Sequence, residues 1–90
     1  MNTISISAKL LPLVKASLKF RKKILTLKVS NYHSRLQSLE KKYRMTTGRF
    51  LKEFEAGNLE DLQDFIEWEY LAESHKHLSQ ELQQINRLKL

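Results

Sequence analysis

The hydrophobic positions of this chain form two long series with the spacing of packed helices. The first series steps alternately by four and three residues: Leu25, Val29, Tyr32, Leu36, Leu39 and Tyr43. The second steps alternately by three and four residues: Trp68, Leu71, His75, Leu78, Leu82 and Ile85. This alternation keeps side chains on one stripe of a helix and is typical of a helix that packs along another. The sequence therefore predicts two long helices that meet along these stripes.

A short middle helix is predicted between the two series. Thr46 is a candidate N-cap, and Phe50 and Phe54 lie on one face of the helix that follows. Gly57 occupies a place where helices commonly end in a left-handed conformation. A capping box would need glutamate or glutamine at position 49, and Arg49 stands there instead.

Two features of the N-terminal half are left open by the pattern. The pair Ser30-Asn31 lies inside the first series, and because either residue is able to cap a helix, one long helix or two successive helices fit the sequence. Ile4 and Ile6 alternate with hydroxyl residues, which is a weak strand signal. We therefore divide the chain into residues 1–9, an arm or short strand, and residues 10–90, a single helical domain.

Together these elements predict an all-α protein, an antiparallel helical hairpin with a short middle helix. The third helix is expected to open near Leu59, with acidic residues in its first turns: Glu60, Asp61 and Asp64. The antiparallel register is expected to bring its later acids near basic residues at the end of the first helix: Glu67, Glu69 and Glu73 near Lys41, Lys42 and Arg44. Two stripes make a thin core, so a homodimer or a helix from another protein would thicken it.

Length and composition limit the classes of protein. The 90 residues make one domain at most. The absence of cysteine excludes a disulfide framework, a zinc ribbon, an iron–sulfur site and a thiol nucleophile. With 41% hydrophobic and 29% charged residues, the composition is that of an ordered protein. The longest apolar stretch near the N-terminus, Leu10–Val14, is too short to cross a membrane, so no membrane partner is expected.

Charge is divided unevenly along the chain. The formal net charge is +6, but residues 1–45 carry eleven basic residues against Glu40 alone, and residues 46–90 carry nine acids against five basic residues. Such a split indicates separate partners of opposite charge, or two halves that neutralise each other within one fold. The lysine-rich, acid-free residues 1–39 also have the composition of an organellar transit peptide. Because the helical pattern continues from them without a break, we expect them to belong to the fold of a cytoplasmic protein.

Candidate catalytic and metal-binding groups lack the spacing that their chemistry needs. His75 and His77 are two residues apart and fall on different faces of a helix, so they do not share a metal ion in the helical manner. Carboxylate pairs such as Glu69 and Glu73 are accompanied by no glycine-rich loop, and the chain is short for a substrate cleft. We therefore predict no enzyme activity, no metal and no cofactor.

A stripe of basic residues offers phosphate-binding charge in the N-terminal half. Its members are Lys15, Lys19, Arg21, Lys22 and Lys23. Such a stripe is able to neutralise the phosphates of nucleic acid. Phe20 is the one aromatic residue among them, so the stripe has no stacking platform for bases. A solubilising face or a docking surface for an acidic protein is the alternative interpretation.

About half of the chain carries a pattern that resembles a known group of proteins. The pattern runs Tyr32-x-x-Arg35-Leu36-x-x-Leu39-Glu40-Lys41-Lys42-Tyr43-x-Met45-Thr46-Thr47, then Phe50 and Phe54, then Gly57-x-Leu59-x-Asp61-x-x-Asp64-Phe65-x-Glu67-Trp68-Glu69-x-Leu71. It is similar to the small antitoxin-like helical proteins encoded beside small toxin genes in prokaryotes, with their E-K-K-Y-x-M-[ST] and D-[YF]-x-E-W-E segments. That group usually has glycine after the tyrosine and an acid in the first turn of the short helix, where this chain has Arg44 and Arg49.

The resemblance implies a non-enzymatic interaction protein that binds and neutralises a small basic toxin. An acidic helix with aromatic residues suits such a partner, because charge steers the encounter and aromatic side chains supply much of the binding energy. The residues predicted to contact the toxin are Asp64, Phe65, Glu67, Trp68, Glu69 and Tyr70. Packing in the core is the alternative role for Trp68, which lies on the hydrophobic stripe. The alternative function is a nucleic-acid-binding or small regulatory protein that uses the basic stripe.

Overall fold

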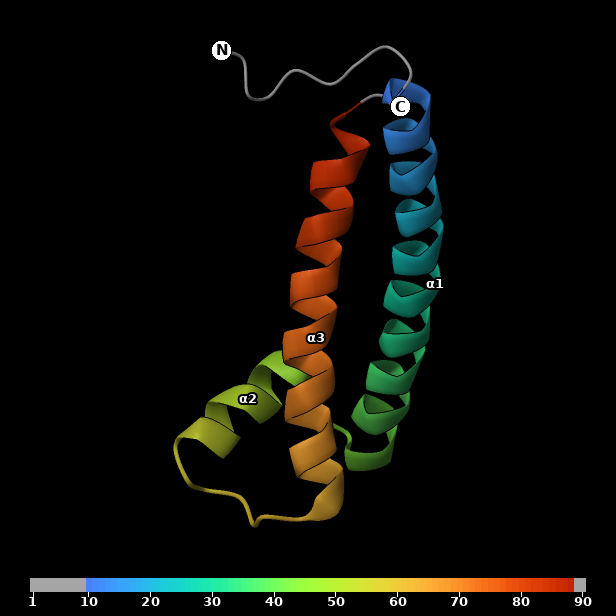
Figure 1. Cartoon of the computed structure of the whole chain (residues 1–90). Helices are drawn as coiled ribbons and strands as arrows, with labels where there is room; N and C mark the ends of the chain where they lie inside the picture. The colour runs from blue at the N-terminus through green and yellow to red at the C-terminus, as the bar shows by residue number, and fades with distance from the viewer. Residues whose placement is uncertain (1–9, 89–90) are drawn as a thin grey trace.

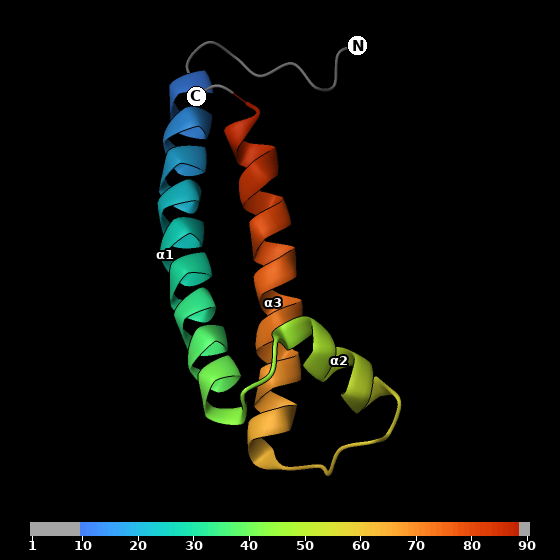
Figure 2. The same ribbon diagram turned by 180° about the vertical axis from the view of Figure 1, so that it is seen from behind.

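Three helices make up the part of the chain that the structure describes, residues 10–88 of a computed structural model. α1 spans Leu11–Tyr43, α2 spans Thr47–Glu55 and α3 spans Gln63–Asn86. α1 and α3 lie side by side and antiparallel (Figure 1). Figure 2, the view from behind, shows α2 crossing the N-terminal half of α3. The predicted all-α hairpin with a short middle helix is therefore confirmed.

α1 is one uninterrupted helix of 33 residues, so the pair Ser30-Asn31 does not divide it. Its length is about 50 Å at the usual rise of an α-helix. Pro12 lies in the first turn, where its missing N–H leaves no hydrogen bond unmade. Leu25 and Leu36, both on the predicted stripe, are buried against α3. The predicted arm or strand at residues 1–9 lies outside the described residues.

The junction between α1 and α2 is closed by hydrogen bonds from both sides. Thr46 is the N-cap of α2, as predicted, and its hydroxyl accepts a hydrogen bond from the Arg49 N–H at 3.2 Å. The Glu40 carboxylate accepts from the Thr47 N–H at 2.8 Å. Glu40 therefore supplies, from the preceding helix, an acidic contact at the start of α2, where position 49 offers none.

Arg44 ends α1 in the left-handed conformation, with φ 52° and ψ 47°. The left-handed conformation destabilises a residue that has a Cβ atom by about 1–2 kcal/mol, and glycine avoids this steric strain. We therefore expect Arg44→Gly to raise the free energy of unfolding by about 0.5–1 kcal/mol, after subtraction of glycine's greater freedom in the unfolded chain. Urea unfolding followed by circular dichroism measures the change. Arg44→Ala removes the same guanidinium and keeps the Cβ, so an equal gain from Arg44→Ala would contradict this explanation.

The connection between α2 and α3 is longer than predicted. Gly57 does have the expected left-handed conformation, with φ 78°. The prediction that α3 opens near Leu59 is wrong, because the helix begins at Gln63 after an extended N-cap at Leu62. Leu59 instead packs against the hydrophobic core as part of the loop, which holds the chain away from helical geometry there. Of the three acids expected in the first turns, only Asp64 is in the first turn of α3.

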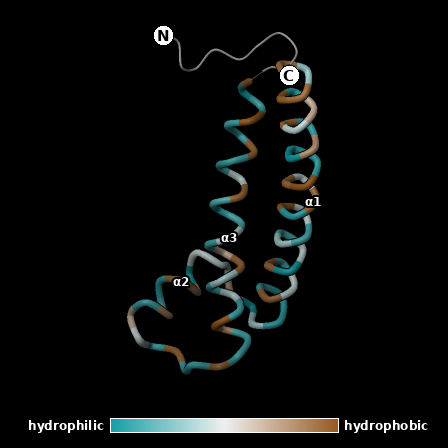
Figure 3. The backbone as a smooth tube through the Cα atoms, viewed as in Figure 1, coloured by the Kyte–Doolittle hydropathy of each residue, from teal (hydrophilic) through white to brown (hydrophobic). Residues whose placement is uncertain are grey.

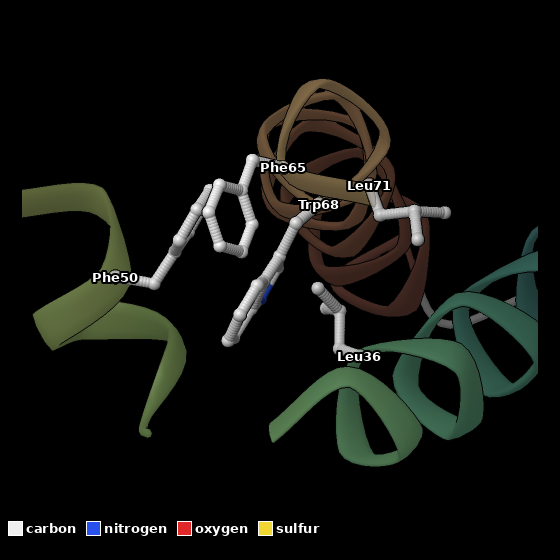
Figure 4. Close-up of a cluster of buried hydrophobic side chains, with 5 residues drawn as sticks. All are labelled: Leu36, Phe50, Phe65, Trp68 and Leu71. Atoms are coloured by element: carbon white, nitrogen blue, oxygen red, sulfur yellow. The ribbon is translucent and has the colours of Figure 1, made fainter. Parts of the chain in front are cut away.

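An aromatic cluster forms the main core where all three helices meet (Figure 4). Its buried members are Leu36, Phe50, Phe65, Trp68 and Leu71. The rings of Phe50 and Trp68 are nearly parallel, with centroids 4.1 Å apart and an interplanar angle of 3°. The indole Nε1–H of Trp68 donates to the Thr47 hydroxyl at 3.0 Å, so the buried ring has its one polar group satisfied.

Ion pairs between α1 and α3 follow a different register from the predicted one. The sequence predicts acids of the third helix beside basic residues at the end of the first: Glu67, Glu69 and Glu73 near Lys41, Lys42 and Arg44. This prediction is wrong, because none of these acids forms an ion pair with any of these basic residues in residues 10–88. Three pairs join the two helices instead: Arg21 with Glu81, Arg35 with Glu67, and Lys42 with Asp64. The Tyr43 ring lies 5.0 Å from that of Phe65 and places the end of α1 beside the first turn of α3. Aromatic packing therefore sets the register, and the charges pair within it.

Candidate functional site

Two of the residues predicted to contact a toxin lie in the core of the chain itself. Trp68 is 0% exposed and Phe65 is also buried (Figure 4). Both rings lie against Phe50 of α2 and against Tyr43 of α1. The structure therefore gives Trp68 the packing role that the sequence left open, and it gives Phe65 the same role.

Two further predicted residues, Asp64 and Glu67, form bonds to α1. Asp64 Oδ2 accepts hydrogen bonds from Lys42 Nζ at 2.7 Å and from Tyr43 Oη at 2.6 Å. These two bonds, that from Lys42 first, hold the pKa of the Asp64 carboxyl below its usual range. The same contact raises the pKa of the Tyr43 hydroxyl, which must keep its proton to donate to the carboxylate. Glu67 pairs with Arg35. Both acids therefore have partners within the fold.

The lowered pKa of Asp64 predicts a loss of stability in acid. Because the unfolded chain binds this proton at a higher pH than the folded protein does, stabilisation by the carboxylate is complete above the ordinary value of 3.8 and is lost as the pH falls below it. We expect the melting temperature to fall on acidification in this range, and to fall less steeply in Asp64→Asn. Asp61→Asn, in the loop, is the matched control. Identical pH profiles for Asp64→Asn and wild type would contradict the assignment.

Glu69 and Tyr70, the last two predicted residues, belong to a surface that the structure extends. Three large apolar side chains are exposed at intervals of four residues: Leu62 at 41%, Ile66 at 50% and Tyr70 at 62%. Intervals of four keep Ile66 and Tyr70 on one side of α3, Glu69 and Glu73 lie on that same side, and Leu62 is the N-cap that precedes it. We call these five residues the acidic outer face. The hydrophobic pattern places Leu62 and Ile66 as extensions of the buried stripe, which is wrong because both side chains are exposed.

Tyr70 also borders a shallow groove between α1 and α3. The groove has a volume of about 260 Å³ and is lined by Lys28, Tyr32, Tyr70, Ser74, His77 and Leu78. The acidic outer face therefore continues into a depression that is able to receive a side chain of a partner.

The predicted basic stripe is divided by the structure. Lys15, Lys19, Lys22 and Lys23 are exposed on α1. The Arg21 guanidinium instead donates two hydrogen bonds to Glu81, Nε to Oε2 at 2.9 Å and Nη2 to Oε1 at 3.0 Å. The pair lowers the pKa of the Glu81 carboxyl, chiefly through the hydrogen bond from Arg21. Four lysines therefore remain as surface charge, and Arg21 joins α1 to α3.

The histidines do not assemble a metal site in residues 10–88, where no three potential ligands of the His, Cys, Asp or Glu types come together. His77 Nε2 lies 3.6 Å from Glu73 Oε1, one turn earlier on α3. His75 on the stripe faces His33 of α1, with ring centroids 6.0 Å apart.

None of the helices in this described part is long and apolar enough to span a membrane.

Comparison of the chain with models of protein families, with curated proteins and with solved structures gives no match. The resemblance to antitoxin-like proteins therefore stays a prediction based on the sequence pattern.

Proposed function

We propose that this chain is a non-enzymatic interaction protein that binds a small basic protein through the acidic outer face of α3. Following the resemblance, the partner is a small toxin, and binding neutralises it. The exposed apolar row of Leu62, Ile66 and Tyr70, bordered by Glu69 and Glu73, carries the proposal. Phe65 and Trp68, which the sequence also predicted to contact the toxin, lie in the hydrophobic core of the chain.

The chemistry of the acidic outer face favours a basic protein as its partner. Glu69 and Glu73 have no lysine or arginine within ion-pair distance in residues 10–88, in contrast to Asp64, Glu67 and Glu81. The nearest basic group to Glu73 is the His77 imidazole, at 3.6 Å, and carboxylates without a lysine or arginine partner are available to steer a partner of opposite sign. Burying the adjacent apolar row would then supply binding energy that persists when salt screens the charges.

Tyr70 is the expected centre of this surface. It is the most exposed of the three apolar residues, and it lies at the edge of the groove next to α1. Tyrosine is enriched among the residues that dominate binding energy, because a large rigid ring and a hydroxyl are offered together. We expect Tyr70→Ala to weaken binding of the partner by about tenfold or more, without loss of helical structure.

A capture experiment from the native host tests the proposal. The tagged chain is incubated with lysate at about 0.3 M salt, where exposed charges alone are largely screened, and bound protein is identified by mass. We expect a stoichiometric small basic protein that is retained by wild type and lost by Tyr70→Ala and Ile66→Ser. Gln80→Ala, further along α3, is the matched control. The partner should inhibit growth when expressed alone, and co-expression of wild type, but not of Tyr70→Ala, should restore growth.

Nucleic-acid binding is the alternative that the same experiment distinguishes. It predicts recovery of nucleic acid without a protein partner, only at low salt, and dependent on the exposed lysines of α1. That result would overturn the proposal. Capture of a basic protein that survives both Tyr70→Ala and Ile66→Ser would also overturn it, because binding would then lie elsewhere on the chain.

A further inference from the structure

A second apolar row lies on α1, on a side that α3 does not cover. Leu13, Phe20 and Leu27 are spaced seven residues apart and are 63%, 66% and 71% exposed. Seven residues make about two helical turns, so the three side chains follow one another along one side of the helix. We call them the outer row. Figure 3 shows how hydrophobic residues recur along the whole of α1, including its first turns.

The outer row repeats every seven residues, which is the length of the heptad on which two helices pack along each other. The inner stripe of α1, which meets α3, has two apolar positions in each heptad, and the outer row has one. The exposed residues Leu10, Leu11 and Val14 widen the apolar surface at the first turns of α1, and further along the helix Phe20 and Leu27 form a narrow row. A narrow row is suited to a single helix, whereas a helix that lies in a lipid surface has a broad apolar face along its length. The spacing therefore favours a helical partner over a membrane.

The charge beside the outer row indicates the charge of the helix that would bind there. Lys19 and Lys23 lie next to it on one edge, and a recess of about 370 Å³ lined by Lys19, Lys22, Lys23, Thr26 and Leu27 adjoins it. The sequence holds no acidic residue before Glu40, so nothing along this row offsets the lysines. Positive charge on one edge of a helix seam favours a partner helix with negative charge on the facing edge.

A second copy of this chain fits the outer row poorly. In a symmetric pair the same patch of both copies meets, so Lys19 and Lys23 of one copy would face a patch that carries the same lysines. Like charges beside a helix seam disfavour the pairing. Nucleic acid fits poorly as well, because phosphates would match the lysines and leave the apolar row without a partner.

We propose that the outer row and the lysines beside it form a docking site for an acidic amphipathic helix of a second protein. This site is separate from the acidic outer face of α3 and does not depend on it. A chain with both sites holds a basic protein on α3 and an acidic helix on α1. It thereby links two partners of opposite charge.

A designed peptide tests this site directly. The probe is a synthetic amphipathic helix of about three heptads with leucine at the seam positions and glutamate at the flanking ones. Its counterpart has lysine in place of glutamate. Titration of the full chain, followed by fluorescence anisotropy of the labelled peptide, is expected to show saturable one-to-one binding of the acidic peptide only. Phe20→Ser and Leu27→Ser are each expected to weaken it at least tenfold, and Tyr70→Ser to leave it unchanged.

The substituted residues are exposed, so the variants should keep the wild-type circular dichroism spectrum. If Phe20→Ser and Leu27→Ser bind the acidic peptide as well as wild type does, the site is overturned, since lysine charge alone would then explain binding. The site is also overturned if the chain ignores the peptide but binds vesicles of phosphatidylserine, or single-stranded RNA. Loss of binding in Tyr70→Ser would place the peptide on α3 instead. None of these results affects capture of a basic protein through Tyr70.

Discussion

Trp68→Ala is expected to remove a large part of the stability of this protein. The Trp68 ring is fully buried, stacks on Phe50 at 4.1 Å and is hydrogen-bonded to Thr47. Truncation of a buried tryptophan typically costs about 3–5 kcal/mol, and the total stability of a folded domain is about 5–15 kcal/mol. Urea unfolding measures the loss. It must be followed by far-ultraviolet circular dichroism, because the variant lacks the only tryptophan of the chain.

Two milder variants separate the contributions of the Trp68 ring. Trp68→Phe keeps an aromatic ring against Phe50 and loses the N–H, so it should be less destabilising than Trp68→Ala. Thr47→Val keeps the ring and leaves its N–H without an acceptor, for an expected cost of about 1–3 kcal/mol. If Trp68→Ala lost less than about 1 kcal/mol, which is an ordinary value for a point substitution, the aromatic cluster would not be the main core.

Leu25→Ala is expected to have the second largest effect, at the other end of the hairpin. Leu25 is 0% exposed but lies outside the aromatic cluster, so it packs where α1 and α3 have no support from α2. Loss of a buried leucine side chain costs about 2–5 kcal/mol. Urea unfolding gives the size of the effect. Hydrogen exchange is expected to show loss of protection in the N-terminal half of α1, with protection around Trp68 retained.

Leu27→Ala is the matched control for Leu25→Ala. The same atoms are removed two residues further along the same helix, from a side chain that is 71% exposed. The expected change is within about 0.5 kcal/mol. Equal losses from the two variants would mean that the outer side of α1 is covered in solution, which would point to self-association of the chain.

Part of the uneven charge of the sequence is neutralised within the fold, and part stays on the surface. Three acids of α3 pair with basic residues of α1, and these pairs neutralise charge within the chain. Glu69 and Glu73 stay available on the acidic outer face, and Lys19 and Lys23 on the opposite helix. α1 and α3 lie side by side, so the side of each long helix that faces away from the other is a separate surface (Figure 1). The two proposed partners of opposite charge would occupy these separate surfaces.

The sequence by itself determined the helical hairpin and its caps. Alternating steps of three and four residues placed both stripes, and every residue on them is buried, as Leu25 and Leu71 are, or half-buried. Thr46 and Gly57 have the conformations expected of an N-cap and a helix stop. These features follow from rules that act within a few residues, or from the period of a single helix, so one sequence is enough to read them.

Only the tertiary structure decided which residues of each helix face outward and how the helices are aligned. Glu40 contacts the start of α2, Tyr43 sets α1 against α3, and Leu59 delays the start of α3 because it packs on the core. The middle helix covers Phe65 and Trp68, which removes them from the candidate surface and leaves Tyr70. Each of these outcomes depends on contacts between segments far apart in sequence, and the period of one helix contains no information about them.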